Sequence, residues 1–282
     1  MNRRQSLGLL AATLLPAVVN AGAAAATPDL SSPESRFRAL MLLRAALDDR
    51  LTMEWIKGVI FGVVDSALKP LFSVNSVAFA YYRSQPDGSF RGRRVEVIYH
   101  GDLVTGQRLE SFLNPYTGAT VEVPMERSGP MDAVLTINGL GLPPRLGPMS
   151  LQGETVIRPA VVRGPRLWIS METRTRLFPP NATRAVSMYN ETMTYAGLLA
   201  DISGDERRSA PSQLSYSNLM SWRPWLQMGN IAGHTVTNGS GEKVESLQEL
   251  PEDLRDFVSQ QHPDLARDAR AVLDAKAGTP AA

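Results

Sequence analysis

The stretch Arg166-Leu-Trp-Ile-Ser-Met-Glu-Thr-Arg-Thr-Arg-Leu-Phe178 decides the fold class, because apolar and polar side chains alternate along it. One set of alternate positions holds Leu167, Ile169, Met171 and Leu177, and the other set holds Trp168, Glu172, Arg174 and Arg176. A period of two places successive side chains on opposite faces of an extended strand. The stretch therefore predicts a long β-strand, which ends at the turn signal Pro179-Pro-Asn181.

The same period of two recurs on both sides of this strand. At 94–100, Val95, Val97 and Tyr99 alternate with Glu96, Ile98 and His100. We expect further strands from residue 74 onward and at 108–113, 120–123, 132–138, 154–161, 182–199 and 213–220. About eight to ten strands separated by turn signals predict a mainly antiparallel sheet, either closed into a β-barrel or folded as a sandwich.

One segment is harder to assign, and another carries a clear turn signal. Residues 52–69 fit a helical stripe through Trp55, Ile56 and Val59, but their glycines and β-branched residues fit a strand equally well. Residues 234–244 contain Asn238-Gly239, which is a strong signal for a two-residue hairpin turn. We therefore expect a hairpin there.

Helices are expected at both ends of the sheet. Ser32-Pro-Glu-Ser35 is a good helix start, and it predicts a helix over 33–48. Residues 250–259 have a proline near their start, acidic residues in the first turn and an apolar face. Pro263 is read as the end of this helix. We expect one β-rich domain over 27–265 and a polar, alanine-rich tail over 266–282.

The N-terminus has the composition of a cleavable signal peptide over 1–26. Arg3 and Arg4 precede a short apolar run at 9–19, and small-residue cleavage sites follow. The run is shorter than the roughly 20 residues that span a membrane. The paired arginines favour the twin-arginine (Tat) export machinery as a partner over Sec export. The mature protein is therefore expected to be periplasmic or secreted, with no membrane span.

Composition excludes several classes of site. The chain has 282 residues and no cysteine, so disulfides, thiolate metal sites and cysteine nucleophiles are impossible. Its net charge of +1 gives no basic field for nucleic acid. Gly139-Leu-Gly141 lacks the third glycine of a nucleotide fingerprint. We predict no cofactor and no metal site.

The segment Ser215-Tyr-Ser-Asn-Leu-Met-Ser-Trp-Arg-Pro-Trp-Leu-Gln-Met-Gly-Asn-Ile-Ala-Gly-His234 carries two of the chain's four tryptophans. Pro224 separates Trp222 from Trp225 and favours an ordered loop. This loop either closes one end of the core or covers a ligand pocket, with Met228 as an adaptable apolar neighbour. Asn114-Pro-Tyr-Thr-Gly118 either forms a simple turn or places Asn114 and Tyr116 at the mouth of that pocket.

Further candidates lie on the strands. Trp168 and Tyr189 are candidate ligand-binding residues, and Tyr99, His100, Glu172 and Arg174 are candidate acid–base or charge-stabilising residues. The face that holds Trp168, Glu172 and Arg174 either lines a polar barrel interior or is exposed to solvent. His100 with Glu96 or Glu172 offers a weak alternative as a metal site.

Together the motifs resemble one known family. They are Asn114-Pro-Tyr-Thr-Gly118, Val121-Glu-Val-Pro124, Trp222-Arg-Pro-Trp-Leu-Gln-Met-Gly229, Gly233 and Glu249-Leu-Pro251. This ordered set is similar to the bacterial and fungal domain-of-unknown-function family numbered 1838, over about residues 37–263. The resemblance implies an exported, single-domain protein. It supplies no reaction and no catalytic residues.

The sequence thus leads to three hypotheses about function. The first is an exported β-barrel that binds a small apolar or aromatic molecule in a pocket covered by Trp222 and Trp225. The second is a cofactor-independent lyase, isomerase or hydrolase that uses the same pocket. The third is a structural or partner-binding protein of the cell envelope.

Overall fold

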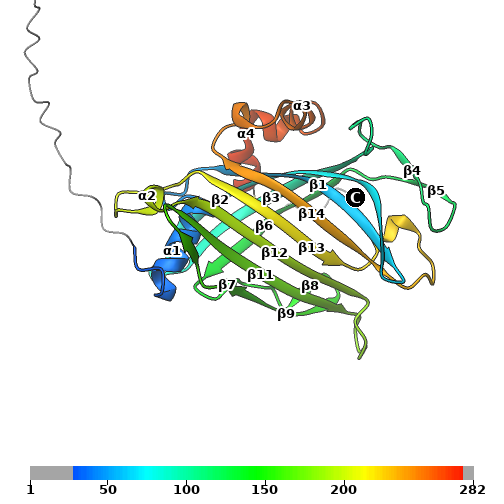
Figure 1. Ribbon diagram of the computed structural model, residues 1–282, viewed down its shortest axis with the longest axis horizontal. Coiled ribbons are helices and arrows are strands. Elements are labelled where there is room, and N and C mark those ends of the chain that lie inside the picture. The colour runs from blue at the N-terminus through cyan, green and yellow to red at the C-terminus, as the bar shows by residue number, and fades with distance from the viewer. Residues whose placement is uncertain (1–27, 276–282) are drawn as a thin grey trace, which may run out of the picture.

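The computed structural model describes residues 28–275, which form one large curled antiparallel sheet with a few flanking helices (Figure 1). The strand order is β7-β6-β3-β2-β1-β14-β13-β12-β11-β9-β8, and β10 pairs with β11 off this path. The strands are β1 (Thr52–Val64), β2 (Ala67–Ser84), β3 (Phe90–Gly101), β6 (Glu126–Thr136), β7 (Gly139–Leu140), β8 (Arg145–Leu146), β9 (Met149–Ile157), β10 (Val161–Arg163), β11 (Arg166–Phe178), β12 (Ser187–Leu198), β13 (Ser212–Met220) and β14 (His234–Val244). The mainly β, antiparallel fold with flanking helices is confirmed, and the signal peptide expected at 1–26 lies outside the described residues.

The sheet is continuous because its first and last long strands are neighbours. β1 pairs with β2 on one side and with β14 on the other. This settles the ambiguous segment at 52–69, which is a strand, a turn at 65–66 and the start of β2. The hairpin expected at Asn238-Gly239 is wrong. β14 runs straight through these residues because β1 and β13 pair with it on both edges, and Gly239 lies opposite Gly58, where the two backbones approach closely.

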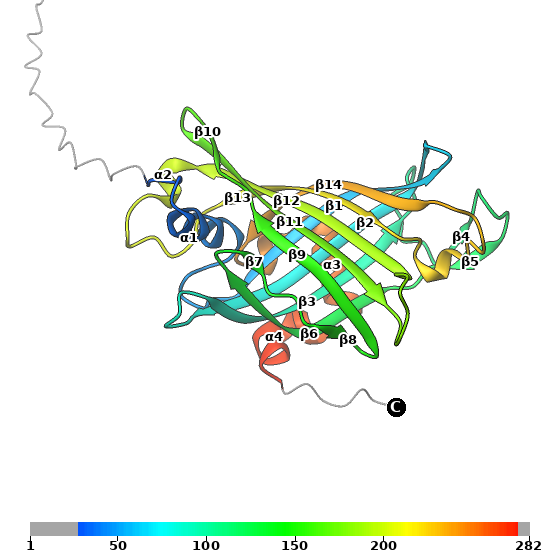
Figure 2. The ribbon, with the colours of Figure 1, turned by 90° about the horizontal axis from the view of Figure 1, so that it is seen from below.

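The sheet curls into an open barrel whose two edges approach each other at one end. Gly139 of β7 lies against Thr155 of β9, where a Cβ atom would come within 2.4 Å of Thr155 Cγ2. Its positive φ of 104° also favours glycine. Figure 2 shows the strands wrapping around the interior, with helices outside the sheet and at one end.

Helix α1 (Pro33–Arg44) closes one end of the barrel. Ser32 caps it as the sequence predicts, since its Oγ accepts a hydrogen bond from the Ser35 amide at 3.2 Å. Its apolar side chains Leu40, Met41 and Leu43 are fully buried in one cluster with the inward-facing Leu167 and Ile169 of β11. The helix ends at Arg44, earlier than the expected residue 48.

Helices α3 (Glu252–Gln261) and α4 (Pro263–Asp274) cover the outside of β1, β2 and β3. Leu265, Ala269 and Leu273 recur at helical spacing and are buried against the sheet. Helix α4 therefore extends to Asp274, within the polar, alanine-rich segment that begins at residue 266. Pro263 ends the preceding helix, as the sequence predicts, and it also begins α4, because a proline is tolerated in the first turn of a helix.

The opposite end of the barrel carries a short hairpin and the tryptophan loop (221–233). The hairpin is formed by β4 (Ser111–Leu113) and β5 (Thr120–Glu122), and the turn expected at 114–118 joins them. The loop contains the 3-10 turn η1 (Pro224–Leu226). Within residues 28–275, no helix is both long and apolar enough to cross a membrane.

Candidate functional site

The middle of the barrel interior is charged. Glu54 of β1, Arg94 and Glu96 of β3, and Tyr189 and Glu191 of β12 all line one internal cavity of about 70 Å³. The other lining residues are Ile56, Val74, Ser76, Ala78, Ile98, Met193, Tyr216, Arg223 and Thr237. This cavity, which we call the interior cavity, is thus bounded by strands from opposite sides of the barrel.

The polar side chains point inward because the apolar face of the same strands is covered from outside. On β3, Val95 and Val97 are fully buried beneath α3 and α4. The alternation of the strand then directs Arg94 and Glu96 into the interior. The helices outside the sheet therefore decide which face of β3 becomes the wall of the cavity.

Hydrogen bonds hold the charged groups of β3 in place. Ser76 donates its hydroxyl to Glu96 Oε1 at 2.6 Å, and Arg94 Nη2 lies 3.0 Å from Glu96 Oε2. Glu96 therefore has a neutral and a charged partner, as a buried carboxylate requires.

On the other side of the cavity, two tyrosines surround Glu191. The Tyr189 hydroxyl donates to Glu191 Oε2, and the hydroxyl groups of Tyr189 and Tyr216 are 3.5 Å apart. Burial raises the pKa of Glu191, and the hydrogen bond from Tyr189 offsets this only in part. Burial also raises the pKa of both tyrosines, so both stay neutral phenols.

Arg44 extends this polar network to the end that α1 closes. Its side chain is buried, and Nη1 donates to the Tyr195 hydroxyl at 2.5 Å. The same helix therefore supplies apolar side chains to the core and a guanidinium group to the interior.

Several polar atoms of this network have no partner among the described residues. They are Glu54 Oε1, Arg44 Nε, Arg94 Nε and Arg223 Nε. A buried donor or acceptor without a partner costs about 1–3 kcal/mol, and more when the group is charged. Three of these residues, Glu54, Arg94 and Arg223, line the interior cavity, and a small polar cavity of this kind suits water or a polar molecule.

The tryptophan loop covers the interior at the end opposite α1. The Trp225 ring packs against Phe72 and His100, at centroid distances of 5.3 and 5.5 Å. Trp222 packs against Tyr116 at 5.7 Å, and its indole N–H donates to the Ile231 carbonyl at 3.0 Å. The loop is thus an ordered, packed cover.

Asn114 fixes this cover to the β4–β5 hairpin. It is 1% exposed, and its amide donates to the Leu226 carbonyl at 2.7 Å and to Met228 Sδ at 3.2 Å. Its Oδ1 accepts the Tyr116 amide at 3.0 Å. Among the residues singled out from the sequence, the structure therefore brings together His100, Asn114, Tyr116, Trp222, Trp225 and Met228.

Arg223 connects the cover to the interior cavity. It lines the cavity, and its Nη1 lies 2.6 Å from Glu126 Oε1, which is also 3.3 Å from His100 Nε2. Burial raises the pKa of Glu126, but the hydrogen bonds from His100 and Arg223 outweigh it and lower the pKa to about 2. Burial lowers the pKa of His100, so a neutral imidazole donates this bond.

Four of the remaining candidates from the sequence, namely Tyr99, Trp168, Glu172 and Arg174, lie outside the barrel. Tyr99 is beneath α3, where its hydroxyl donates to Asp253 at 3.1 Å. Glu172 pairs with Arg158 at 2.6 Å and with Arg174 at 3.1 Å on the outer face of β11. Trp168 lines shallow outer grooves, one of them shared with Trp55.

The interior-facing alternative for Trp168, Glu172 and Arg174 therefore needs correction. The interior face of β11 is the apolar one, with Leu167, Ile169 and Met171 buried. Tyr189 is the one strand candidate besides His100 that points into the barrel, and it lines the interior cavity. The interior cavity has a charged lining, and Trp222, Trp225 and Met228 are not among its lining residues.

Sequence reasoning named Tyr189, and Glu96 only as a weak metal-site alternative, and it missed the other charged residues that line the cavity. Glu54 stands between Met53 and Trp55, and Glu96 stands between Val95 and Val97. A single acidic residue inside an apolar strand is the available signal. A solvent-facing residue gives the same pattern, so the signal alone does not identify an interior site.

Metal binding has little support from this geometry. No group of three or more histidine or acidic side chains in the described part of the chain is arranged to hold a metal ion. His100 and Glu126 are joined instead by a hydrogen bond, with Arg223 as the third member.

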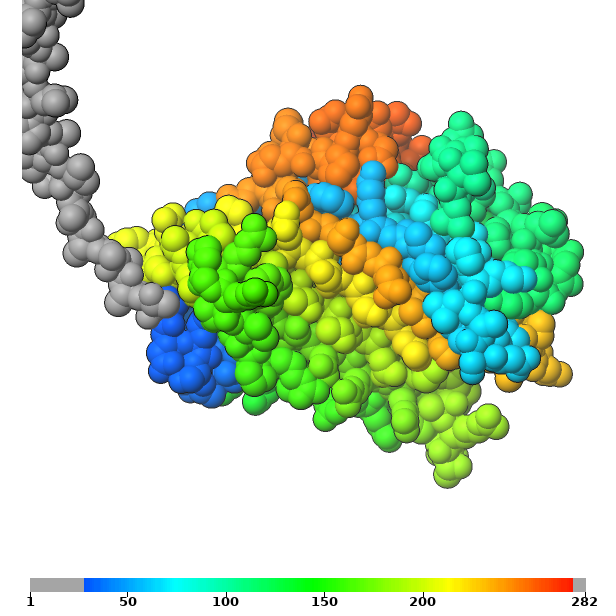
Figure 3. Space-filling model, viewed as in Figure 1, coloured from blue at the N-terminus to red at the C-terminus, as the bar shows by residue number. Residues whose placement is uncertain are grey.

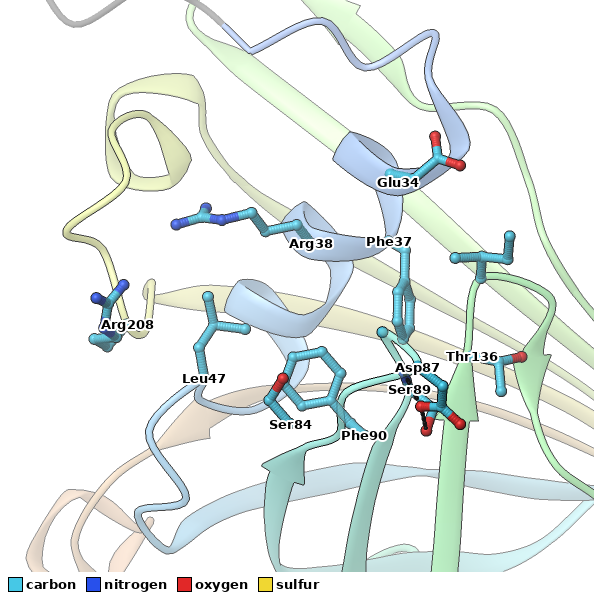
Figure 4. Close-up of a pocket in the computed structure, with 12 residues that line it drawn as sticks. Glu34, Phe37, Arg38, Leu47, Ser84, Asp87, Ser89, Phe90, Thr136 and Arg208 are labelled. Carbon is cyan, nitrogen blue, oxygen red and sulfur yellow. Dashed lines mark hydrogen bonds between the residues drawn. The ribbon is translucent and has the colours of Figure 1, made fainter.

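A larger concavity lies outside the barrel, beside α1. It has a volume of about 730 Å³ and is lined by α1, the turn between β2 and β3, and the loop before β13 (Figure 4). We call it the α1 groove. The smaller interior cavity is the better candidate for the main site, because the buried charges and shifted pKa values surround it.

Comparison with known proteins supports the resemblance seen in the motifs. Residues 170–280 match the family described as "Protein of unknown function (DUF1838)". This match supports the DUF1838 family for that part of the chain. The DUF1838 match includes Tyr189, Glu191, Tyr216 and the tryptophan loop, and it begins after β1, β2 and β3. No curated protein and no solved structure matched the chain.

Proposed function

We propose that this protein binds a small polar molecule in the interior cavity, beneath the tryptophan loop. The observation that carries the proposal is the set of unpartnered buried atoms around a cavity, chiefly Glu54 Oε1, Arg94 Nε and Arg223 Nε. Two of these atoms are donors and one is an acceptor. A ligand with both kinds of group would complete the network.

The volume of the cavity limits the size of the ligand. One water molecule needs about 10–15 Å³ of such space. The cavity of about 70 Å³ therefore holds roughly five to seven waters, or a molecule with about that many non-hydrogen atoms. The lining favours a polar compound over the apolar or aromatic one that the tryptophans suggested.

Native mass spectrometry of the protein purified from its source tests this proposal. We expect a mass excess over the polypeptide that corresponds to a small molecule. The variant Ala78→Leu fills part of the cavity without changing its charge, since Ala78 is buried in the lining. It should lose the excess mass. The matched control Ala196→Leu adds the same bulk to an outer groove and should retain it.

A panel of polar compounds with up to about seven non-hydrogen atoms gives a second measurement by thermal shift. If the purified protein has a bare mass and no compound raises its melting temperature, ligand binding in the cavity is excluded. Equal loss of bound mass in Ala78→Leu and Ala196→Leu would place the bound molecule elsewhere.

Acid–base catalysis in the same cavity is a second candidate function. Glu191 favours it, because burial raises the pKa of this carboxyl group and Tyr189 donates to it. A carboxyl group with a raised pKa can exchange a proton with a bound molecule without a cofactor. With the molecule identified by mass spectrometry as the substrate, Glu191→Gln should keep binding and abolish turnover. Unchanged turnover would exclude this role.

We also propose export to the periplasm or beyond by the twin-arginine machinery. The support comes from residues 1–26, with Arg3 and Arg4 before a short apolar run. Replacing both arginines with lysine should retain the precursor in the cytoplasm, as measured by cell fractionation. Continued export of that variant would favour the Sec route.

A further inference from the structure

The α1 groove differs in character from the interior cavity. Its volume of about 730 Å³ lies within the usual range for sites that hold small organic ligands. Figure 4 shows its lining side chains arranged around an aromatic centre, with charged groups at the margins. No part of this lining is shared with the interior cavity.

The centre of the groove is apolar. Phe37 of α1 and Phe90 of β3 meet edge to face at a centroid distance of 5.8 Å. Both are buried in the core, and Leu47 and Ile137 also contribute apolar side chains to the lining. This surface suits the aliphatic or aromatic body of a ligand.

Two guanidinium groups lie together at one margin. Arg38 Nη2 donates to the carbonyls of Asp205 and Arg207, at 3.3 and 3.2 Å. Arg208 Nη1 donates to the same two carbonyls, at 2.6 and 3.3 Å. The two cations are therefore neighbours, held by a shared pair of neutral acceptors.

Neither cation forms an ion pair with a carboxylate in the described part of the chain. Two adjacent like charges without a counter-charge repel each other, and a bound anion would relieve the repulsion. Arginine also binds carboxylates in a bidentate manner. This margin is therefore suited to an anionic group.

The acidic residues of the groove lie on the other side of its aromatic centre from Arg208 (Figure 4). They already have local partners, since Ser32 donates to Glu34 at 2.9 Å and Ser89 donates to Asp87. Hydrogen bonds from these serines lower the pKa of Asp87 and contribute to the lowered pKa of Glu34. Both margins are thus charged, with opposite sign, which orients an anionic ligand toward Arg38 and Arg208.

We propose that the α1 groove binds an amphipathic organic acid, with its carboxylate at Arg38 and Arg208 and its apolar body over Phe37 and Phe90. The site is separate from the interior cavity, so the proposal does not depend on what that cavity holds. A ligand with a cationic head or a neutral head of the same length should bind much more weakly.

Isothermal titration calorimetry with decanoate tests the proposal, with decylamine and decanol as matched probes. We expect decanoate to bind more tightly than either, and its affinity to fall with added salt. The double variant Arg38→Gln/Arg208→Gln should weaken decanoate binding about tenfold or more. Ser84→Trp should also weaken it, because Ser84 is an exposed residue of the groove lining.

The matched control is Arg163→Gln, which removes the same charge from an exposed position outside the groove lining. It should bind decanoate as the unmodified protein does. Absence of decanoate binding, equal binding of decylamine, or equal loss in Arg163→Gln would each overturn the proposal. Circular dichroism of each variant confirms that a loss of binding is not a loss of fold.

Discussion

Glu126 lies at the boundary between the tryptophan loop and the interior cavity, where one side chain contributes to the stability of the fold. It accepts hydrogen bonds from Arg223 of the tryptophan loop and from His100 of β3. Its pKa falls from the ordinary value of 4.5 to about 2, although burial alone would raise it. The ionised carboxylate is therefore favoured by the folded protein.

The pH dependence of stability follows from this shift. The contribution of Glu126 is fully present above pH 4.5 and is lost as the pH falls toward 2, by up to roughly 3 kcal/mol. We expect Glu126→Gln to be less stable than the unmodified protein at pH 7. The difference between the two should shrink as the pH falls to 2, in urea denaturation at each pH.

The control for this measurement is Glu122→Gln, an exposed acidic residue on β5. It should change stability little, and the change should not depend on pH. A stability difference for Glu126→Gln that stays constant from pH 7 to pH 2 would contradict the ionised role of this carboxylate.

At the same scale, the sequence predicts where the strands lie better than it predicts which face of a strand points into the barrel. The alternation at 94–100 correctly separates Val95 and Val97 from Glu96 and His100. The pattern does not say that the apolar set faces outward, because that depends on α3 and α4, which come about 150 residues later in the chain. The alternation therefore identifies the strand, but it does not identify Glu96 as a residue of the interior cavity.

At the scale of elements, the tryptophan loop is held by one buried amide. Asn114→Ala removes its hydrogen bonds to Leu226 and Met228 and leaves the Leu226 carbonyl without this partner. We expect a loss of about 1–3 kcal/mol in the free energy of unfolding. We also expect a change in tryptophan fluorescence under native conditions, because Trp222 and Trp225 lie in the released loop.

The matched control is Asn138→Ala, an exposed asparagine in the turn between β6 and β7. It should leave both the fluorescence and the unfolding midpoint nearly unchanged. If Asn114→Ala destabilises the protein but the tryptophan spectrum stays the same, Asn114 supports the hairpin alone and does not position the loop.

The sequence predicts an element correctly where a local signal decides it. It fails where pairing with neighbouring strands overrides the local signal. Ser32 and Pro33 start α1 as expected, since a cap is a local interaction. The Asn238-Gly239 signal failed because β1 and β13 supply partners along both edges of β14. Tertiary pairing over the whole strand outweighs the preference of two residues for a turn.

At the scale of the whole molecule, the pairing of β1 with β14 joins the two halves of the sheet. β1 belongs to the half that α3 and α4 cover, and β14 leads into the half that contains β13, β12 and β11. In Figure 3 the outer face of this second half lies toward the viewer, with the C-terminal helices at the top. The interior cavity spans this junction, since Glu54 comes from β1 and Thr237 from β14.

The rate of amide hydrogen exchange in each strand should depend on how many neighbouring strands pair with it. The amides of β1 and β14 lie between hydrogen-bonded strands on both sides, so they should exchange only through global unfolding. The short edge strands β8 and β10 each pair with one neighbour, so they should exchange through local opening. Exchange followed by mass spectrometry checks this order, with the outer hairpin β4–β5 as an internal fast reference. If β1 and β14 exchanged as fast as the edge strands, the junction would open on its own, and the two halves of the sheet would be separate folding units.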